Sequence, residues 1–353
     1  MSVMSIRERL EAEERRALSP FAQLSDATRG RERPEPAEPD DMRPDYQHDL
    51  DRIIHCKSFR RLAHKTQVFL SPEGDHYRTR ITHSLEVAQV ARTICRALGL
   101  NPQLTEAIAM GHDLGHTPFG HAGEAVLAKL VPGGFHHARQ SLRVVEQLEL
   151  DGAGLNLTVE VRDGILKHSK GKGPIISDNA AVMAMTLEGQ VVRISDIMAY
   201  VNHDLDDAIR AGLLVEADLP VEVRRVLGES HRMRARRLVE AVVAGTHLEE
   251  KRAVRVEAEA LGALVELRDF LYDRVYEFPP VRGEFEKAQR ILEELWAWYH
   301  AHPDEFRANW WPKGTREEEG LGRAVTDFLS GMTDRYALRA YEELRLPRRW
   351  SIY

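Results

Sequence analysis

Cysteine is scarce in this chain of 353 residues, which has only Cys56 and Cys95. They form neither a CxxC pair nor a disulfide framework, and such sparse usage is typical of the reducing cytosol. No apolar run reaches the roughly 18 residues that a membrane-spanning helix needs. The N-terminal segment MSVMSIRERLEAEERRA is charged where a secretory signal peptide would be apolar. We therefore expect a cytoplasmic protein without a membrane partner.

An excess of positive charge is also absent. The chain has 49 Lys and Arg against 56 Asp and Glu, for a formal net charge of −7. This balance argues against a general nucleic-acid binder, although a local basic stretch, HRMRARR, occupies residues 231–237. Hydrophobic residues make up 43% and charged residues 30% of the chain. Those fractions exclude collagen-like and wholly disordered chains and are typical of a globular protein with a substantial core.

Three segments differ in character. Residues 1–45 are charged and contain a Pro- and Glu-rich stretch with few apolar residues, which predicts a mobile arm with a short helix at its start. From residue 46 onward, apolar residues recur at spacings of three and four, and no run alternates with period two for long. The sequence therefore predicts an all-α protein, with residues 46–210 as the chemical core and 211–353 as a supporting helical region of the same globular unit.

Histidine is unevenly distributed. Ten of the 16 histidines lie in residues 48–137, and the run GHDLGHTPFGHAGE at 111–124 places three histidines and two carboxylates around a Pro/Gly turn. The adjacent His112 and Asp113 can both bind one cation, although an isolated His-Asp pair is more often solvated or part of a helix cap. His83 and Asp196 would complete an H…HD…D pattern across three helices, and the turn can direct His121 and Glu124 toward the same metal.

Six ordered motifs resemble a known family. These motifs are YQHDLDRIIHCKSFRRLAHKTQVF, RTRITHSLEV, GHDLGHTPFGHAGE, QSLRVVE, SDIMAYVNHD and GMTDRYAL. Together they resemble the deoxynucleoside triphosphate (dNTP) triphosphohydrolases, the dGTPase-like group of HD-domain proteins. The resemblance covers residues 46–210 and reappears at 331–345. It implies an α-helical HD fold that hydrolyses a dNTP at the α-phosphate, giving a deoxynucleoside and tripolyphosphate.

The resemblance also implies roles for individual residues. One divalent metal ion per site (Mn, Mg, Fe or Co) would be bound by His83, His112, Asp113 and Asp196. The catalytic group would comprise His121, Glu124, His116 and Arg80 beside the phosphates. The substrate would contact Gln67, His137, Lys167, Tyr200 and Asp204, with Tyr200 and Asp204 under the deoxyribose and Gln67 at the sugar 3′-hydroxyl.

The spacing of these residues is compatible with such roles. Asp196, Tyr200 and Asp204 follow one another at intervals of four, so they share one face of a helix. His112 and His116 are also four apart. Structural alternatives stay open for several residues: Tyr200 as a packing aromatic, His116 as an orienting residue, Arg80 on the surface and Gln67 in a polar loop.

The expected mechanism combines the metal with nearby acid–base groups. A bound divalent ion can lower the pKa of its water from about 15.7 to about 7 and polarise the α-phosphate. A mutual hydrogen bond would hold Glu124 and His121 in place, and either could act as base or acid. Lys167, Lys170 and Lys172, in and beside a Gly/Lys loop, are candidates to pair with the triphosphate, with a solvated surface as the alternative.

Two other functions compete with this one. The first is an HD phosphodiesterase or nucleotidase acting on another nucleotide. The second is a nucleic-acid-binding regulatory oligomer that uses residues 231–237 and binds single strands weakly. The resemblance further implies a homo-oligomer and an allosteric dNTP, whereas the preferred base does not follow from the sequence.

Overall fold

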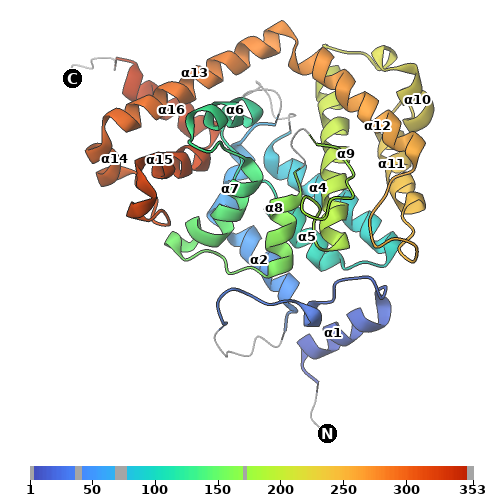
Figure 1. Ribbon diagram of the computed structural model, residues 1–353. Coiled ribbons are helices and arrows are strands. Elements are labelled where there is room, and N and C mark those ends of the chain that lie inside the picture. Colours follow the sequence, from blue (N-terminus) through green and yellow to red (C-terminus); the bar gives the residue numbers. More distant parts are fainter. Residues whose placement is uncertain (1–3, 36–41, 68–77, 170–172, 348–353) are drawn as a thin grey trace, which may run out of the picture. The chain divides into compact units, whose positions relative to one another are not determined.

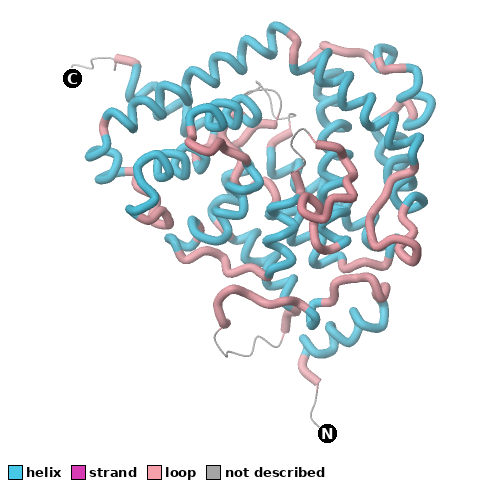
Figure 2. The backbone as a smooth tube through the Cα atoms, in the orientation of Figure 1, coloured by secondary structure: helices cyan, strands magenta, loops and turns pink. Residues whose placement is uncertain are grey.

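The computed structural model describes residues 4–35, 42–67, 78–169 and 173–347. Sixteen α-helices lie in these ranges, and no strand forms there (Figures 1 and 2). The extended pairings in the described ranges are two isolated antiparallel bridges, between Arg31 and Thr158 and between Thr66 and Thr79. The predicted all-α fold is confirmed. No helix in the described ranges combines the length and the apolar character needed to cross a membrane.

The chain divides into two compact units. Unit 1 comprises Met1–His55, Thr82–His112 and Leu155–Phe278, and unit 2 comprises Cys56–Ile81, Asp113–Gly154 and Pro279–Tyr353. Each unit therefore draws on three separate stretches of the chain. The predicted division at residues 45 and 210 follows sequence character rather than contacts, and it stays a prediction.

Unit 1 is built around the long helix α9 (Leu187–Arg210). Its other helices are α1 (Ile6–Ala17), α2 (Asp45–His55), α4 (Arg80–Leu98, whose first two residues belong to unit 2), α5 (Pro102–Gly111), α8 (Val159–Lys167), α10 (Val221–Leu227), α11 (His231–Gly245) and α12 (Ala258–Leu271). The Thr186 side chain caps α9 by accepting from the Gly189 N–H. Helices α5, α8, α11 and α12 pack against α9, and most of its side chains are buried. Asp196 and Tyr200 are among the few that stay partly accessible.

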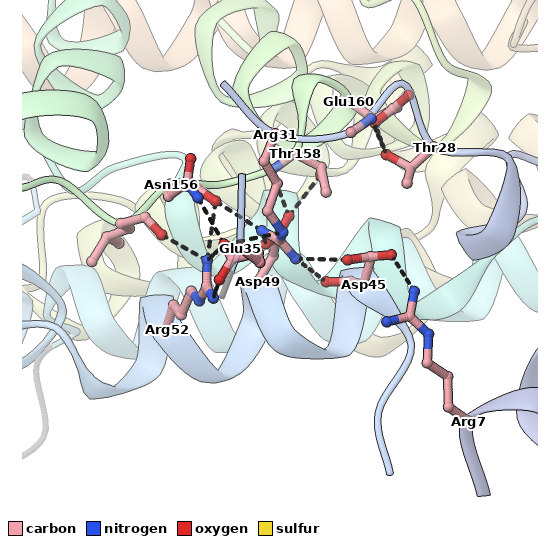
Figure 3. A network of polar contacts seen from close by, with 12 residues as sticks. Arg7, Thr28, Arg31, Glu35, Asp45, Asp49, Arg52, Asn156, Thr158 and Glu160 are labelled. Carbon is pink, nitrogen blue, oxygen red and sulfur yellow. Dashed lines mark hydrogen bonds and ion pairs between the residues drawn. The ribbon is translucent and has the colours of Figure 1, made fainter. Parts of the chain in front are cut away.

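A polar network ties the segment that follows α1 to the rest of unit 1 (Figure 3). The Arg31 guanidinium donates to the Asp49 carboxylate of α2 and, at 2.8 Å, to the Asn156 carbonyl. The other oxygen of Asp49 accepts from the Thr158 N–H and hydroxyl, at 2.9 and 2.6 Å. Asp49 is fully buried, and opening such a pair costs about 3–5 kcal/mol. The network fixes the chain around Arg31 against α2 and the start of α8.

Unit 2 has a core of its own. Its helices are α3 (Lys57–Arg61), α6 (Gly120–Leu130), α7 (His137–Arg143), α13 (Pro279–Ala301), α14 (Pro303–Asn309), α15 (Gly320–Gly331) and α16 (Asp334–Arg345). The long helix α13 packs against α6, α15 and α16. Leu292, Leu295 and Tyr299 of α13 are buried there with Phe306 of α14 and Leu329 of α15. This core supports the loop between α5 and α6, which carries the clustered histidines.

That loop needs special backbone geometry at its end. Phe119 has φ 60° and Gly120 has φ 55°, both in the left-handed region. A Cβ at position 120 would lie 2.8 Å from the Gln67 carbonyl oxygen, so glycine is needed both for the conformation and for the close approach. The turn starts α6 and thereby determines where His121 and Glu124 project.

Candidate metal and catalytic site

Three predicted metal ligands converge within unit 1. His83 lies on α4, His112 at the C-terminal end of α5 and Asp196 on α9. The His83 Nε2 lies 3.0 Å from the Asp196 Oδ1, and the His112 Nε2 lies 3.8 Å from the same oxygen. The two imidazoles meet edge to face with their centroids 5.4 Å apart. Nitrogen and oxygen atoms at these separations form a set that a single divalent cation can bridge.

The hydrogen bonds of His112 fix its tautomer. Its Nδ1 lies 2.6 Å from the Ala109 carbonyl oxygen, which can only accept, so Nδ1 carries the proton. The neutral ring therefore has its lone pair on Nε2, the nitrogen directed toward Asp196. Burial would raise the pKa of the Asp196 carboxyl, but the adjacent His83 and His112 outweigh it and lower that pKa. Asp196 is thus anionic across the neutral range.

Asp113 follows His112 directly in the chain and begins the next stretch of unit 2. Its Oδ2 accepts a 2.6 Å hydrogen bond from Nη1 of Arg80, the first residue of α4, and both side chains are buried. The alternative of a surface position for Arg80 is therefore wrong. A carboxylate has two oxygens, so pairing with Arg80 is compatible with metal ligation by Asp113. The two imidazoles and the carboxylate of unit 1 are donor types that suit Mn²⁺, Fe²⁺ or Co²⁺.

Side chains of the kinds that bind metals also cluster within unit 2. Ligand atoms of Asp113, His116 and His137 lie within 4.8 Å of one another, as do those of His116, His121 and Glu124 and those of Glu124, His136 and His137. His116 and His137 stack with centroids 4.6 Å apart and an interplanar angle of 17°. The loop, the start of α6 and the start of α7 therefore bring together a group of imidazoles with the carboxylates of Asp113 and Glu124.

Within this group, Glu124 is bonded to His137 rather than to His121. The Glu124 Oε1 accepts from the backbone N–H and the ring Nδ1 of His137, both at 2.9 Å. The His121 Nδ1 lies 3.9 Å from Glu124 Oε2, too far for a hydrogen bond. The expected bond between His121 and Glu124 is therefore wrong, because the turn into α7 places His137 closer. His121 is also half exposed, whereas His137 is largely buried.

Glu124 and His137 form a charged pair. Burial would raise the pKa of the Glu124 carboxyl, but the charge of His137 and its two hydrogen bonds lower it to about 2. Burial would lower the pKa of the His137 imidazole, but Glu124 raises it. His116 differs, since burial and the nearby Arg80 lower its pKa well below the usual range. Around neutral pH the group therefore combines an ionised carboxylate with an uncharged His116.

Two buried side chains hold the histidine loop in place. Lys65 donates to the carbonyls of His116 and Ser330. Asp334, the first residue of α16, accepts from the Phe119 N–H at 2.9 Å and from the N–H and hydroxyl of Thr66 at 2.9 and 2.6 Å. Asp334 belongs to the GMTDRYAL motif, which therefore serves to anchor the loop and the segment before Gln67 to the C-terminal helix.

The predicted sugar-side residues lie on α9 within unit 1. Tyr200 and Asp204 meet Tyr276, whose hydroxyl donates to the Asp204 carboxylate. The Asp204 Oδ1 is buried and has no hydrogen-bond partner among the described residues. Burial raises the pKa of Asp204 to about 7. Asp204, bonded to Tyr276, therefore offers a buried oxygen that can accept a hydrogen bond from a hydroxyl group.

Tyr276 was missed by the sequence analysis. It ends a π-helical segment, Tyr272–Tyr276, that follows α12. The sequence there reads as an ordinary amphipathic helix, and no spacing marks Tyr276, because a π-helical turn shifts the register of the side chains that follow.

Two buried histidines were also missed. The ring of His168 packs edge to face on His112 at 4.9 Å, and that of His203 packs on His83 at 5.4 Å. His168 directly follows Lys167, and His203 directly precedes Asp204. Lys167 and Asp204 are both predicted substrate contacts. That proximity was the available signal, but a neighbour in a helix points to a different face.

Gln67 and Lys167 occupy different environments. Gln67 is buried, and its Oε1 lacks a hydrogen-bond partner among the described residues, so it can still bind a donor. The Lys167 Nζ instead lies 2.8 Å from Asp163 one turn earlier on α8. Lys170 and Lys172 lie outside the described residues.

Comparison with known proteins finds two matching domains and several full-length relatives. Residues 80–200 match the HD domain, and residues 254–343 match the phosphohydrolase-associated domain. A deoxyguanosinetriphosphate triphosphohydrolase-like protein of Caldanaerobacter subterraneus subsp. tengcongensis is 52% identical over 350 residues, 98% of each chain. One of Desulfatibacillum aliphaticivorans is 49% identical over 354 residues, 98% of this chain and 99% of the relative. One of Clostridium perfringens strain SM101 is 48% identical over 348 residues, which are 98% of this chain and 99% of the relative.

The matched HD domain contains both histidines predicted to be ligands, the histidine loop and the part of α9 that carries Asp196 and Tyr200. The phosphohydrolase-associated match contains Tyr276 and Asp334, the residues that contact Asp204 and the loop. The first two relatives share about half of their residues with this chain over 98% of its length. The chain belongs to the deoxyguanosinetriphosphate triphosphohydrolase-like family of HD-domain proteins.

Proposed function

We propose that this protein is a metal-dependent hydrolase of deoxynucleoside triphosphates, cleaving at the α-phosphate to release a deoxynucleoside and tripolyphosphate. The observation that carries the proposal lies on one face of α9. Asp196 meets His83 and His112 there, and two turns further on Asp204 presents a buried acceptor beside Tyr276. A cation site and a hydroxyl acceptor on one helical stripe suit a phosphorylated sugar.

The metal would be held by His83, His112, Asp113 and Asp196, and the residues present fit it. Bound there, a divalent ion supplies Lewis-acid activation of water and of a phosphoryl oxygen. Arg80, buried against Asp113, contributes fixed positive charge for the phosphates. Lys167 is a further candidate for the phosphates once its pairing with Asp163 opens.

Glu124 and His137 divide the acid–base work. The Glu124 carboxylate, ionised at neutral pH, accepts a hydrogen bond from the attacking water and orients it. His137, whose pKa Glu124 raises, is a source of positive charge and of a proton for the departing oxygen. The neutral His116, stacked on His137, and the more exposed His121 complete the phosphate side.

The sugar side distinguishes a nucleotide from a simple phosphate ester. Asp204 accepts from a sugar hydroxyl while Tyr276 donates to the same carboxylate, and Tyr200 packs beside them. The Gln67 carboxamide, whose oxygen is available, binds the 3′-hydroxyl. The names of the relatives favour dGTP as a preferred substrate.

The geometry favours hydrolysis over the nucleic-acid alternative. Within the basic stretch 231–237, Arg234 is buried and donates to Asn202. Arg236 pairs with Glu240 at 2.7 Å, and Arg237 pairs with Glu257 at 2.8 Å. Three of its arginines are therefore already engaged.

The proposal also includes a homo-oligomer, an allosteric dNTP and a cytoplasmic location. The cytoplasmic location is supported by two buried free cysteines.

Product analysis tests the reaction. The purified protein is incubated with dGTP and Mn²⁺, and the products are resolved by ion exchange. Deoxyguanosine with tripolyphosphate is expected, and the same reaction with His112→Ala should give none, whereas the exposed His247→Ala should match the wild type. Pyrophosphate or orthophosphate without tripolyphosphate would contradict the proposal and indicate another nucleotidase activity. A panel of dNTPs, alone and in pairs, measures base preference and activation.

A further inference from the structure

His203 joins a surface carboxylate to a predicted metal ligand within unit 1. It lies on α9 and is 2% exposed. Its Nδ1 lies 3.4 Å from the Nδ1 of His83, with the two rings nearly perpendicular at 88°. Its Nε2 contacts the carboxylate of Glu86, three residues beyond His83 on α4. Both ring nitrogens of His203 are thus engaged by other side chains, so His203 is placed to orient a ligand rather than to be one.

The position of the protons in these contacts follows from the groups involved. The Glu86 carboxylate only accepts, so the proton of His203 lies on Nε2. The Nδ1 of a neutral His203 is then an acceptor, and the shared proton belongs to Nδ1 of His83. The lone pair of His83 is left on Nε2, the atom 3.0 Å from Asp196 Oδ1. An imidazole in this tautomer offers the lone pair of Nε2 to a divalent cation.

His112 reaches the same state by a different route. Its Nδ1 donates to the carbonyl of Ala109 on its own helix, which leaves the lone pair on Nε2. The Nδ1 of His83 instead faces the Nδ1 of His203 on another helix. A metal-bound imidazole commonly depends on a hydrogen bond from its second nitrogen for orientation and basicity.

We propose that Glu86 and His203 are positioning residues that hold His83 with Nε2 directed at a divalent cation. This inference rests on the metal site proposed above. Glu86 has a third of its side chain exposed (34%), and an ion pair that reaches solvent in this way adds little to folding stability. Its removal should therefore change cation affinity without changing the stability of the metal-free protein, which a purely structural contact would not do.

The contacts from Glu86 through His203 to His83 are called the relay below. Calorimetric titration of the metal-free full-length protein with Mn²⁺ tests it. Glu86→Ala should weaken Mn²⁺ binding about 10–100-fold, with the unfolding midpoint of the metal-free protein unchanged. Glu86→Gln keeps an oxygen that accepts from His203 and should restore most of the affinity. Glu86→Lys replaces the acceptor by a donor and should bind at least as weakly as Glu86→Ala. Glu106→Ala, which removes a carboxylate paired with Arg92 of α4, is the matched control and should bind as the wild type does.

The outcomes separate the relay from the metal site itself. Wild-type affinity in both Glu86→Ala and Glu86→Lys, with binding lost in His112→Ala, would overturn the relay alone. Equal weakening in Glu86→Ala and Glu106→Ala would also overturn it. A wild-type protein that binds no Mn²⁺, or a His112→Ala variant that binds as tightly as the wild type, would instead remove the metal site on which the relay depends.

Discussion

His137 donates two hydrogen bonds to Glu124, one from its backbone N–H and one from its ring, both 2.9 Å long. The double contact fixes the carboxylate relative to α7 and keeps it ionised. With a pKa lowered to about 2, Glu124 is a poor proton donor at neutral pH but a firm hydrogen-bond acceptor. In the proposed mechanism this relationship gives Glu124 the acceptor role and His137 the donor role.

Replacing Glu124 by glutamine separates catalysis from metal binding. The amide keeps the size of the side chain but loses the negative charge, so we expect unchanged Mn²⁺ affinity and a kcat about 10²–10⁴-fold lower. Steady-state kinetics and calorimetry on the same preparation measure both. Glu342→Gln, at an exposed site on α16, serves as the control. A Glu124→Gln enzyme with wild-type kcat would remove this residue from the mechanism.

Asp334 should matter for both stability and turnover. Asp334→Ala leaves the buried N–H groups of Phe119 and Thr66 without their acceptor, which should cost about 2–4 kcal/mol of unfolding free energy. The freed histidine loop should also lower kcat. Urea denaturation and kinetics provide the two readouts. Asp304→Ala, which removes an exposed carboxylate from the first turn of α14, should leave both unchanged; a similar loss there would argue against a specific clamp.

Glu188 predicts a pH dependence of stability in unit 1. It is fully buried, accepts from the N–H groups of Gln23 and Asn101, and burial raises its pKa from 4.5 to about 7. A carboxyl with a higher pKa in the folded state binds its proton more tightly there. Its contribution is therefore fully present below pH 4.5 and is lost as the pH rises to about 7.

Glu188→Gln should abolish this dependence. The amide is neutral at all pH values and keeps an oxygen for both N–H groups, so we expect the variant to be about 1–3 kcal/mol more stable than the wild type at pH 8. At pH 4.5 the two proteins should be similar. Chemical denaturation at both pH values measures the difference, with the exposed Glu249→Gln as control. An identical pH profile in Glu188→Gln would assign the dependence to other groups.

Tyr276→Phe tests the sugar side. It removes the hydroxyl that donates to Asp204 and leaves the ring in place, so the carboxylate is less well oriented for a substrate hydroxyl. We expect KM for dGTP to rise about tenfold with a smaller change in kcat. Tyr272→Phe is a close control, because Tyr272 is one turn away and 56% exposed. Equal KM values in Tyr276→Phe and the wild type would place the sugar elsewhere.

Much of the fold was readable from the sequence. Spacings of three and four identified the helices because each buries one apolar stripe, and that period is local. The spacing of four that links Asp196, Tyr200 and Asp204 placed them on one stripe for the same reason, and α9 carries them so. The ordered motifs identified His83, His112 and Asp196 as a set, and the structure brings these three together.

Other features depend on contacts between segments that are distant in the sequence. His137 rather than His121 bonds Glu124 because the turn before α7 returns the chain to α6. Tyr276 reaches Asp204 from 72 residues away through a π-helical turn, and Asp334 reaches Phe119 across 215 residues. Helical periodicity fixes only the direction of a side chain on its own helix. The partner that a side chain meets depends on how the helices pack, and only the tertiary structure shows that packing.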